Sequence, residues 1–175
     1  MSLLTSPRAE IYLLPFREQH AATLVSWVKS ESEMRWLAPS TPPPLTEEKV
    51  LSWQKPGGHA FVGYDDSCGD MVAYGELNPM GHRSDRLWIG HCLIRPDRRG
   101  RGIGQTFVRV LLKEAFDHLK SSRVSLIVFP DNQPAVRCYQ RAGFAFISEE
   151  WHTFVPGRPE RLMKLEALPP GRKQR

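Results

Sequence analysis

The chain has 175 residues, of which 41% are hydrophobic, 10% aromatic and 25% charged. This composition is typical of a soluble globular domain with a core and excludes a chain that is disordered throughout. No apolar run reaches the roughly 20 residues of a membrane helix, and the formal net charge of +5 suits an anionic ligand.

The cysteines and the start of the chain bear on location. Cys68, Cys92 and Cys138 are odd in number and lack CxxC spacing, so no disulfide scaffold is expected. The first residues lack the basic and apolar regions and the cleavage site of a secretion signal. The sequence therefore predicts a cytoplasmic protein without a metal site.

The first third of the chain predicts one strand and two helices. A short strand is expected at residues 10–16, and apolar side chains at helical spacing predict a helix within residues 17–37. The proline run at 42–44 cannot continue this helix. Thr46 is suited to cap a second helix over 46–54, which the following glycines end.

Three strands are expected next. Residues 59–65 and 71–78 are strand-like, and the segment between them has the composition of a turn. Residues 86–94 are more apolar, which predicts a central strand.

The remaining elements alternate between helix and strand. An amphipathic helix is expected over 103–120 and a buried strand over 123–129. A short helix is expected within 131–144, with Asp131 or Asn132 as its cap and Gly143 as its stop. Residues 145–154 and 158–168 predict a closing pair of strands.

The order of these elements predicts an α/β domain, α+β mixed in character, that combines hairpins with crossovers. We expect a mixed, mostly antiparallel sheet of about seven strands flanked by four helices. Residues 1–168 form a single domain in this prediction, and 169–175 form a basic C-terminal tail.

The stretch RPDRRGRGIGQT, residues 95–106, joins a strand to a helix and contains Gly100, Gly102 and Gly104. Glycines at a helix N-terminus let an anion approach the free backbone amides. The stretch lacks the GK[ST] of a nucleotide-hydrolysing loop and the GxGxxG of a dinucleotide site. It does match RxxGxG, a pyrophosphate cradle that begins at Arg99; a basic loop that only tightens the turn is the alternative.

Further motifs follow this stretch in a fixed order. CLIRP precedes RGRGIG, and after the helix come the strand VSLIVF and the segment NQPAVRCYQRAGF. This series resembles the signature of the GNAT superfamily of N-acetyltransferases, most strongly between Trp88 and Phe146. The element order resembles the family fold over nearly the whole chain except the tail.

The resemblance implies a site for acetyl-coenzyme A. In relatives the cradle amides hold the pyrophosphate, and a strand backbone pairs with the pantetheine arm. Asn132 would reach the pantetheine or the nucleotide, and Arg95, Arg98 and Arg101 would add charge near the ribose phosphate or remain solvated. The other cofactor-binding residues implied are Cys92, Leu93, Ile94, Arg99, Gly100, Arg101, Gly102, Ile103, Gly104 and Gln105.

Tyr139 aligns with the family tyrosine that donates a proton to the departing sulfur. A phenol and a thiol have pKa values close enough for this role. The alternative is a core aromatic residue, because Tyr139 shares a helix face with Ala135 and Ala142. Cys92 and Cys138 are interpreted as small apolar residues without a partner base.

Two residues are candidates for the general base. Glu76 is a base, a substrate anchor or a surface acid in this interpretation. His91 differs in strand parity from Trp88, the position often used in relatives, so it is a catalytic residue only where a bulge resets the register, and otherwise a structural histidine. Acceptor specificity is expected from the region between the first two helices, from residues 78–87 and from residues 151–160. The candidates for an aromatic acceptor pocket are Trp27, Trp36, Trp53 and Trp151, with core packing the favoured interpretation of Trp27 and Trp53.

The predicted function is transfer of an acetyl group from acetyl-coenzyme A to a primary amine by direct attack in a ternary complex. The acceptor is a small molecule or a peptide or protein amine. A non-catalytic acetyl-coenzyme A sensor is the alternative. Nucleic-acid binding is disfavoured because no aromatic platform accompanies the arginines, no membrane partner is expected, and a homodimer is compatible with the family.

Overall fold

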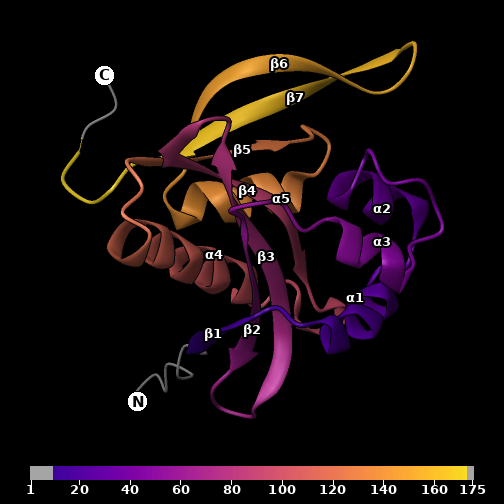
Figure 1. Cartoon of the computed structure of the whole chain (residues 1–175), viewed down its shortest axis with the longest axis horizontal. Coiled ribbons are helices and arrows are strands. Elements are labelled where there is room, and N and C mark those ends of the chain that lie inside the picture. The colour runs from indigo at the N-terminus through magenta and orange to yellow at the C-terminus, as the bar shows by residue number, and fades with distance from the viewer. Residues whose placement is uncertain (1–9, 173–175) are drawn as a thin grey trace, which may run out of the picture.

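The computed structural model describes residues 10–172 and is shown in Figure 1. The first nine residues, where a secretion signal was sought, and the last three of the expected basic tail lie outside this range. Within it, no helix combines the length and the apolar character needed to cross a membrane.

A seven-stranded sheet forms the centre of the fold, in the order β1-β2-β3-β4-β5-β7-β6. Only β4 and β5 are parallel; the other neighbours are antiparallel. The strand expected to be central is β4, the fourth of the seven. The strands are β1 (Ile11–Pro15), β2 (His59–Asp65), β3 (Asp70–Met80), β4 (Arg83–Ile94), β5 (Arg123–Val128), β6 (Ala145–Val155) and β7 (Arg158–Ala167).

The parallel pair is short. β4 and β5 are in register only at Arg86 with Arg123, Leu87 with Val124, and Trp88 with Ser125. Beyond these pairs β4 runs on to Ile94 without β5 beside it, so the sheet is split at this end. Backbone groups on the free edge of a strand can pair with another extended chain.

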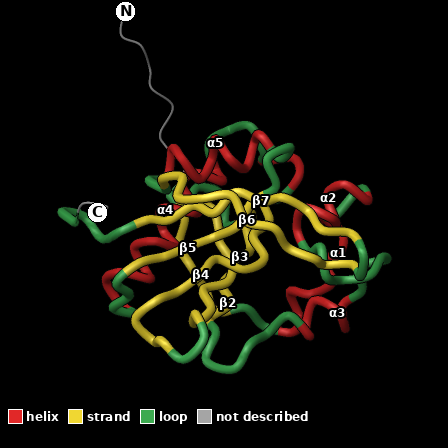
Figure 2. Tube along the Cα trace, turned by 90° about the horizontal axis from the view of Figure 1, so that it is seen from above, coloured by secondary structure: helices red, strands yellow, loops and turns green. Residues whose placement is uncertain are grey.

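Helices cover both faces of the sheet (Figures 1 and 2). On one face α4 (Ile103–Lys113) and α5 (Gln133–Ala142) pack on the larger core. Phe107, Leu111 and Ala115 of the expected amphipathic ladder are fully buried there. The other face carries a second core beneath α1 (Ala21–Trp27), α2 (Glu31–Leu37) and α3 (Glu47–Ser52).

The first expected helix is two helices, so residues 10–172 contain five α-helices instead of four. Val28 has an extended backbone, with φ −88° and ψ 115°, and ends α1. The Ser30 hydroxyl then accepts a hydrogen bond from the Glu33 amide at 3.2 Å and starts α2. A serine cap inside a periodic apolar pattern produces this break.

The predicted caps of the later helices are present. Thr46 accepts a hydrogen bond from the Lys49 amide at 3.3 Å at the start of α3. Asn132 caps α5 by accepting one from the Ala135 amide at 3.4 Å, and Gly143 ends that helix with φ +117°.

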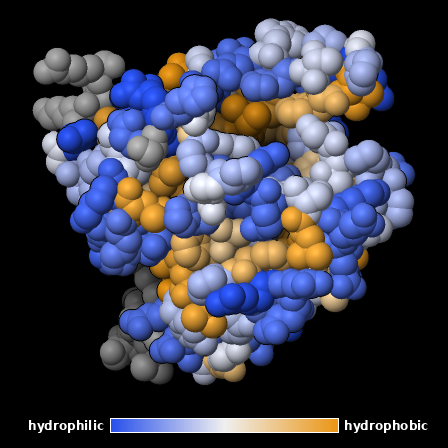
Figure 3. Space-filling model, viewed as in Figure 1, coloured by the Kyte–Doolittle hydropathy of each residue, from blue (hydrophilic) through white to orange (hydrophobic). Residues whose placement is uncertain are grey.

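The β6–β7 hairpin arches over the top of the molecule and reaches towards α2 (Figure 1). In the same view, Figure 3 shows apolar atoms in the hollow beneath this hairpin, framed by hydrophilic surface.

Candidate active site

A β-bulge in β4 sets the geometry of the site. Gly75 pairs with Cys92, but Leu77 pairs with Ile89, so Gly90 and His91 together lie opposite Glu76. Trp88 lies opposite Asn78, whose amide binds the same carboxylate as His91. Directly paired residues share a face of the sheet, so the bulge brings His91 to the face of Trp88.

Glu76 is at the centre of a buried polar network. Its Oε1 accepts hydrogen bonds from the Tyr74 hydroxyl at 2.6 Å and from His91 Nδ1 at 3.0 Å. Its Oε2 accepts one from Asn78 Nδ2 at 3.1 Å. The side chain is 2% exposed, so the interpretation as a surface acid is wrong. Three donors around one carboxylate are the partners that an ionised side chain needs.

The same network affects Tyr74. Burial, and then the nearby Glu76 carboxylate, raise the pKa of its phenol well above the usual range. Gln54 Nε2 donates to the Tyr74 hydroxyl at 3.2 Å and completes the chain of contacts. Tyr74 therefore stays neutral and donates its hydrogen to Glu76.

Gly90 makes room for this carboxylate. A Cβ at this position would lie 2.5 Å from Glu76 Oε2 and 2.8 Å from Asn78 Nδ2. Both distances are too short for carbon next to a polar atom. Gly90 thus allows the close approach of the β4 backbone that the buried carboxylate requires.

The ring of His91 is held from two directions. Its Nδ1 is bonded to Glu76, and its face stacks on Trp53 with centroids 4.0 Å apart and planes at 12°. Trp53 is buried, as expected, and is fixed in turn by a 3.0 Å hydrogen bond from its Nε1 to the Thr41 hydroxyl. The His91 side chain remains 18% exposed, so Nε2 is the ring nitrogen left for further chemistry.

Tyr139 of α5 lies on the opposite face of the sheet. Its ring packs against Phe144, with centroids 5.8 Å apart, and its side chain interacts with that of Cys92 at the edge of the larger core. Burial, and then the neighbouring Cys92 and Cys138, raise the pKa of the phenol well above its ordinary value. Burial raises the pKa of Cys92 to about 12. The expectation that Cys92 is an unreactive small residue agrees with this environment.

The glycine stretch presents open backbone at the start of α4. Gly100 and Gly102 have φ angles of +73° and +80°, and a Cβ on either would meet nothing within 4 Å. The first helical hydrogen bond runs from the Thr106 amide to the Gly102 carbonyl at 3.0 Å. The amides of Ile103 and Gly104 lie before Thr106 and so have no carbonyl partner within the helix. Such amides, at the positive end of the helix dipole, are suited to bind an anion.

Gly104 has a different role from the other two glycines. A Cβ there would lie 3.1 Å from Cys138 Sγ and 3.4 Å from Ile94 Cγ1. Gly104 therefore allows α4 to pack closely on α5 and on the end of β4. Gln105 also serves this packing, because its Nε2 donates to the Arg141 carbonyl at 3.2 Å.

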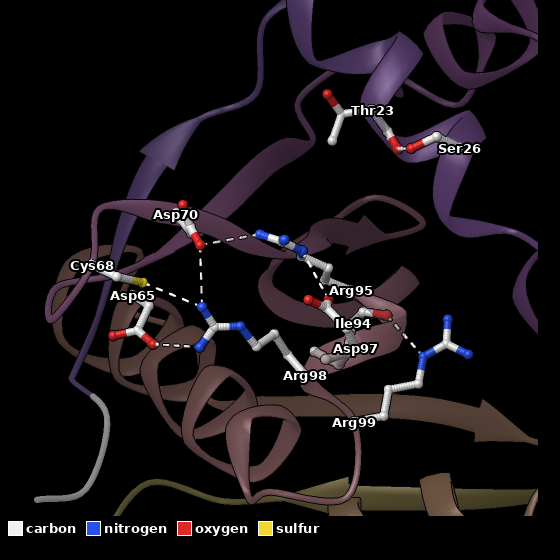
Figure 4. A network of polar contacts seen from close by, with 10 residues as sticks. All are labelled: Thr23, Ser26, Asp65, Cys68, Asp70, Ile94, Arg95, Asp97, Arg98 and Arg99. Atoms are coloured by element: carbon white, nitrogen blue, oxygen red, sulfur yellow. Dashed lines mark hydrogen bonds and ion pairs between the residues drawn. The ribbon is translucent and has the colours of Figure 1, made fainter.

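Two arginines of the stretch are bound to acids of the β2–β3 hairpin, as Figure 4 shows. Arg95 pairs with Asp70 at 3.3 Å and with Asp97 at 2.8 Å. Arg98 pairs with Asp65 at 3.4 Å and with Asp70 at 3.1 Å. Arg95 and Arg98 are therefore ion-paired and not solvated loop arginines, while their expected place near a ribose phosphate stays a prediction. The ion pairs with Asp65 and Asp70 hold the loop against the β2–β3 hairpin.

Arg99 points towards α2. Its Nε donates to the Ile94 carbonyl at 2.9 Å, and its guanidinium pairs with Glu33. Arg101 of the same stretch is exposed. Of the two cofactor arginines predicted from RxxGxG, one thus connects the loop to a helix and the other faces solvent.

A groove of about 480 Å³ lies beside this loop on the α1 side. Figure 4 shows Thr23 and Ser26 of α1 across from Arg95. The walls of this groove come from segments that are far apart in the chain, so no sequence motif could predict the groove. The lining residues are Thr23, Ser26, Trp27, Lys29, Met71, Arg95, Pro96 and Asp97.

The predicted catalytic residues meet around β4. Glu76 and His91 lie at the bulge on the face of the first three helices, and Tyr139 contacts the next residue, Cys92, from the face of α4 and α5. Asn132 lies at the N-terminus of α5, and its side chain is used in the helix cap. The contacts of Tyr74 and Asn78 with Glu76, and of Trp53 with His91, were not predicted, because only the folded chain brings these side chains together.

Comparison with known proteins agrees with this arrangement. The model of the Acetyltransferase (GNAT) family matches residues 22–144. A spermine/spermidine N(1)-acetyltransferase of Bacillus subtilis (strain 168) is 26% identical over 134 residues, which cover 75% of this chain and 86% of the relative. An aminoglycoside N(6')-acetyltransferase type 1 of Klebsiella pneumoniae is 24% identical over 161 residues, covering 82% and 78%.

The fold is shared with solved structures as well. Spermidine N-acetyltransferase from Vibrio cholerae, in complex with CoA and spermine, superposes with a TM-score of 0.75 at 17% identity, covering 91% of this chain and 95% of that one. The predicted fold class and family are confirmed. The matched segment runs from α1 through the glycine stretch to the end of α5, and so includes β4, its bulge and Tyr139. The chain belongs to the acetyltransferase (GNAT) family.

Proposed function

We propose that this acetyltransferase acetylates a primary amine of a small molecule that carries several cationic amines. The observation that carries the proposal is the pairing of an acid and a base across one strand. Tyr139 contacts β4 from one face, and the Glu76–His91 pair lies on the other face at the neighbouring residue. Relatives named for spermine, spermidine and aminoglycosides act on molecules with several amines, which supports this acceptor class.

The start of α4 has the form that a pyrophosphate needs. Gly100 and Gly102 leave open the space that side chains would fill, next to amides at the positive end of a helix. Bound acetyl-coenzyme A supplies the acetyl thioester. We propose that the loop amides hold its diphosphate and that the free edge of β4, residues 92–94, pairs with the pantetheine arm.

Tyr139 is proposed as the general acid. Burial keeps its phenol protonated through the neutral range, so a hydrogen is always available to the departing sulfur. The packing of its ring, which favoured a core role, also fixes the direction of the hydroxyl. The two interpretations of this residue are therefore compatible.

His91 is proposed as the group that receives the proton of the acceptor ammonium. Glu76 is nearly inaccessible and both of its oxygens are already bonded, so it does not contact the acceptor. It instead fixes the Nδ1–H tautomer of His91, leaves Nε2 as the basic atom, and stabilises the imidazolium that forms. Glu76 is thus a positioning residue and His91 the base.

A panel of amines tests the acceptor class. We expect the protein, acetyl-coenzyme A and either spermine, spermidine or kanamycin to release free coenzyme A, measured with a thiol reagent. A peptide with a free N-terminus and a lysine side chain is the comparison, and we expect it to react more slowly. Release of coenzyme A with the peptide but with none of the three small amines would contradict the acceptor class. No release with any acceptor of the panel would contradict the enzyme activity.

Replacing His91 by glutamine is expected to lower kcat about 100-fold, because the ammonium then loses its proton without a base. His118→Gln is the matched control, since this histidine also pairs with a glutamate but lies exposed after α4. An acceptor analogue with an aminooxy group, which is uncharged at neutral pH, should lose much less rate in H91Q. Equal losses with both acceptors would contradict the role of a base.

Location and assembly complete the proposal. The three cysteines are free thiols, which supports a cytoplasmic location. A homodimer is proposed from the family resemblance alone.

A further inference from the structure

Helix α2 lies across the open end of the split between β4 and β5. Glu33 near its start pairs with Arg99, which follows β4. Arg35, two residues later, pairs with Asp131, which follows β5, and with Glu160 of β7. One helix of seven residues is therefore bound to both sides of the split.

Arg35 makes several contacts at once. Its Nη2 and Nε lie 2.7 and 2.9 Å from Glu160 Oε1, and its Nη1 lies 3.1 Å from Asp131 Oδ2. The guanidinium carbon lies 4.0 Å from the centre of the Phe129 ring. Trp36 adds a 3.3 Å hydrogen bond from Nε1 to Asp131 Oδ1. A planar guanidinium suits such a set of partners, and a lysine ammonium does not.

This arrangement differs from an ordinary surface ion pair. A single exposed pair contributes little, because two flexible side chains must be ordered in water. Here three groups surround the cation of Arg35, and they come from the β5–α5 connection and from β7. The contacts join segments about 95 and 125 residues away in the chain.

The position of α2 matters for the amine. His91 lies on the face of the sheet that α1, α2 and α3 cover, and α2 itself contacts β4. Glu160 belongs to the 151–160 segment from which acceptor specificity is expected, and Figure 1 shows the β6–β7 hairpin reaching above α2.

We infer that Arg35 is a positioning residue for the acceptor: it fixes α2 against β7 and the β5–α5 connection and so shapes the entrance through which the amine reaches His91. The inference rests on the proposed acetyltransfer to a multiply charged amine. The proposed site for the diphosphate of acetyl-coenzyme A is the loop on the β4 side of the split, where Arg99 pairs with Glu33. Loss of Arg35 should therefore affect the acceptor more than the cofactor.

Steady-state kinetics of Arg35→Ala with acetyl-coenzyme A and spermine tests the inference; if wild type does not turn over spermine, the panel amine that it acetylates replaces it. We expect KM for the amine to rise about tenfold, with kcat and KM for acetyl-coenzyme A changed less than about twofold. Arg35→Lys should recover only part of the affinity. Arg161→Ala is the matched control on β7, because Arg161 pairs with Glu149 on the exposed surface, and it should behave as wild type.

A second variant separates this role from a loss of folding. Glu160→Gln should raise KM for the amine in the same way, and the double variant should show less than the sum of the two effects, because both remove one interaction. An unchanged KM for the amine in Arg35→Ala, or equal changes in both KM values and kcat, would overturn the inference. Wild-type protein inactive with every amine of the panel would contradict the proposed function instead.

Discussion

Gly102→Val is expected to weaken binding of acetyl-coenzyme A by at least about 100-fold while the protein still folds. Gly102 has φ +80°, and the space next to it is open. A valine there would project into the region where the diphosphate meets the amides of the loop. It would also disfavour the left-handed backbone, at a cost of about 1–3 kcal/mol in the free energy of unfolding.

Calorimetric titration with coenzyme A measures the affinity, and urea unfolding measures the stability. Gly81→Val is the matched control, because Gly81 has φ +58°, an open neighbourhood and a place in the turn between β3 and β4, at the other end of β4. We expect this control to lose similar stability and to keep its affinity. Wild-type affinity in Gly102→Val would exclude the loop as the diphosphate site.

Tyr139→Phe is expected to lower kcat about 100-fold or more, since the departing thiolate then lacks a proton donor. Affinity for acetyl-coenzyme A should change little, because the ring and its packing against Phe144 are kept. The raised pKa of the phenol has a second consequence. The neutral donor form persists at every pH below its ordinary value of about 10, so Tyr139 should produce no alkaline fall in rate in that range.

Single-turnover rates and calorimetry separate these effects. Tyr64→Phe, on β2 and stacked on Tyr12 with centroids 5.6 Å apart, is the control for loss of a phenolic hydroxyl elsewhere. Turnover of Tyr139→Phe equal to wild type would remove the residue from the chemistry. A large loss of affinity with unchanged kcat would assign it to cofactor binding alone.

The order of the strands and the start of α4 were predictable because their signals are local. Apolar periodicity marked the ladder that contains Phe107 and Leu111, and the alternating glycines marked the open backbone before α4. The caps at Thr46 and Asn132 follow from side chains that bond to amides three residues away. Such features depend on a few neighbouring residues.

The environment of Glu76 could not be predicted in the same way. One extra residue in β4 brings His91 to the face of the carboxylate, and a single bulge leaves no trace in apolar periodicity. The pairs of Arg98 with Asp65, and of Arg35 with Glu160, join residues that only the folded chain brings together. The break before Ser30 was also missed. The apolar pattern favoured one continuous helix, whereas the chain forms two.

The three-residue register between β4 and β5 also affects how the domain resists unfolding. β1 to β4 are antiparallel neighbours, whereas β5 to β7 form a second group of strands whose backbone is paired with β4 only at these three positions. The proposed pairing of the pantetheine arm with β4 in this gap requires the native arrangement, which the unfolded chain lacks. Bound cosubstrate should therefore raise the free energy of unfolding by about 2.7 kcal/mol when its free concentration is 100 times its dissociation constant. The bound molecule would then add contacts between the two groups of strands where their own backbone pairing is short.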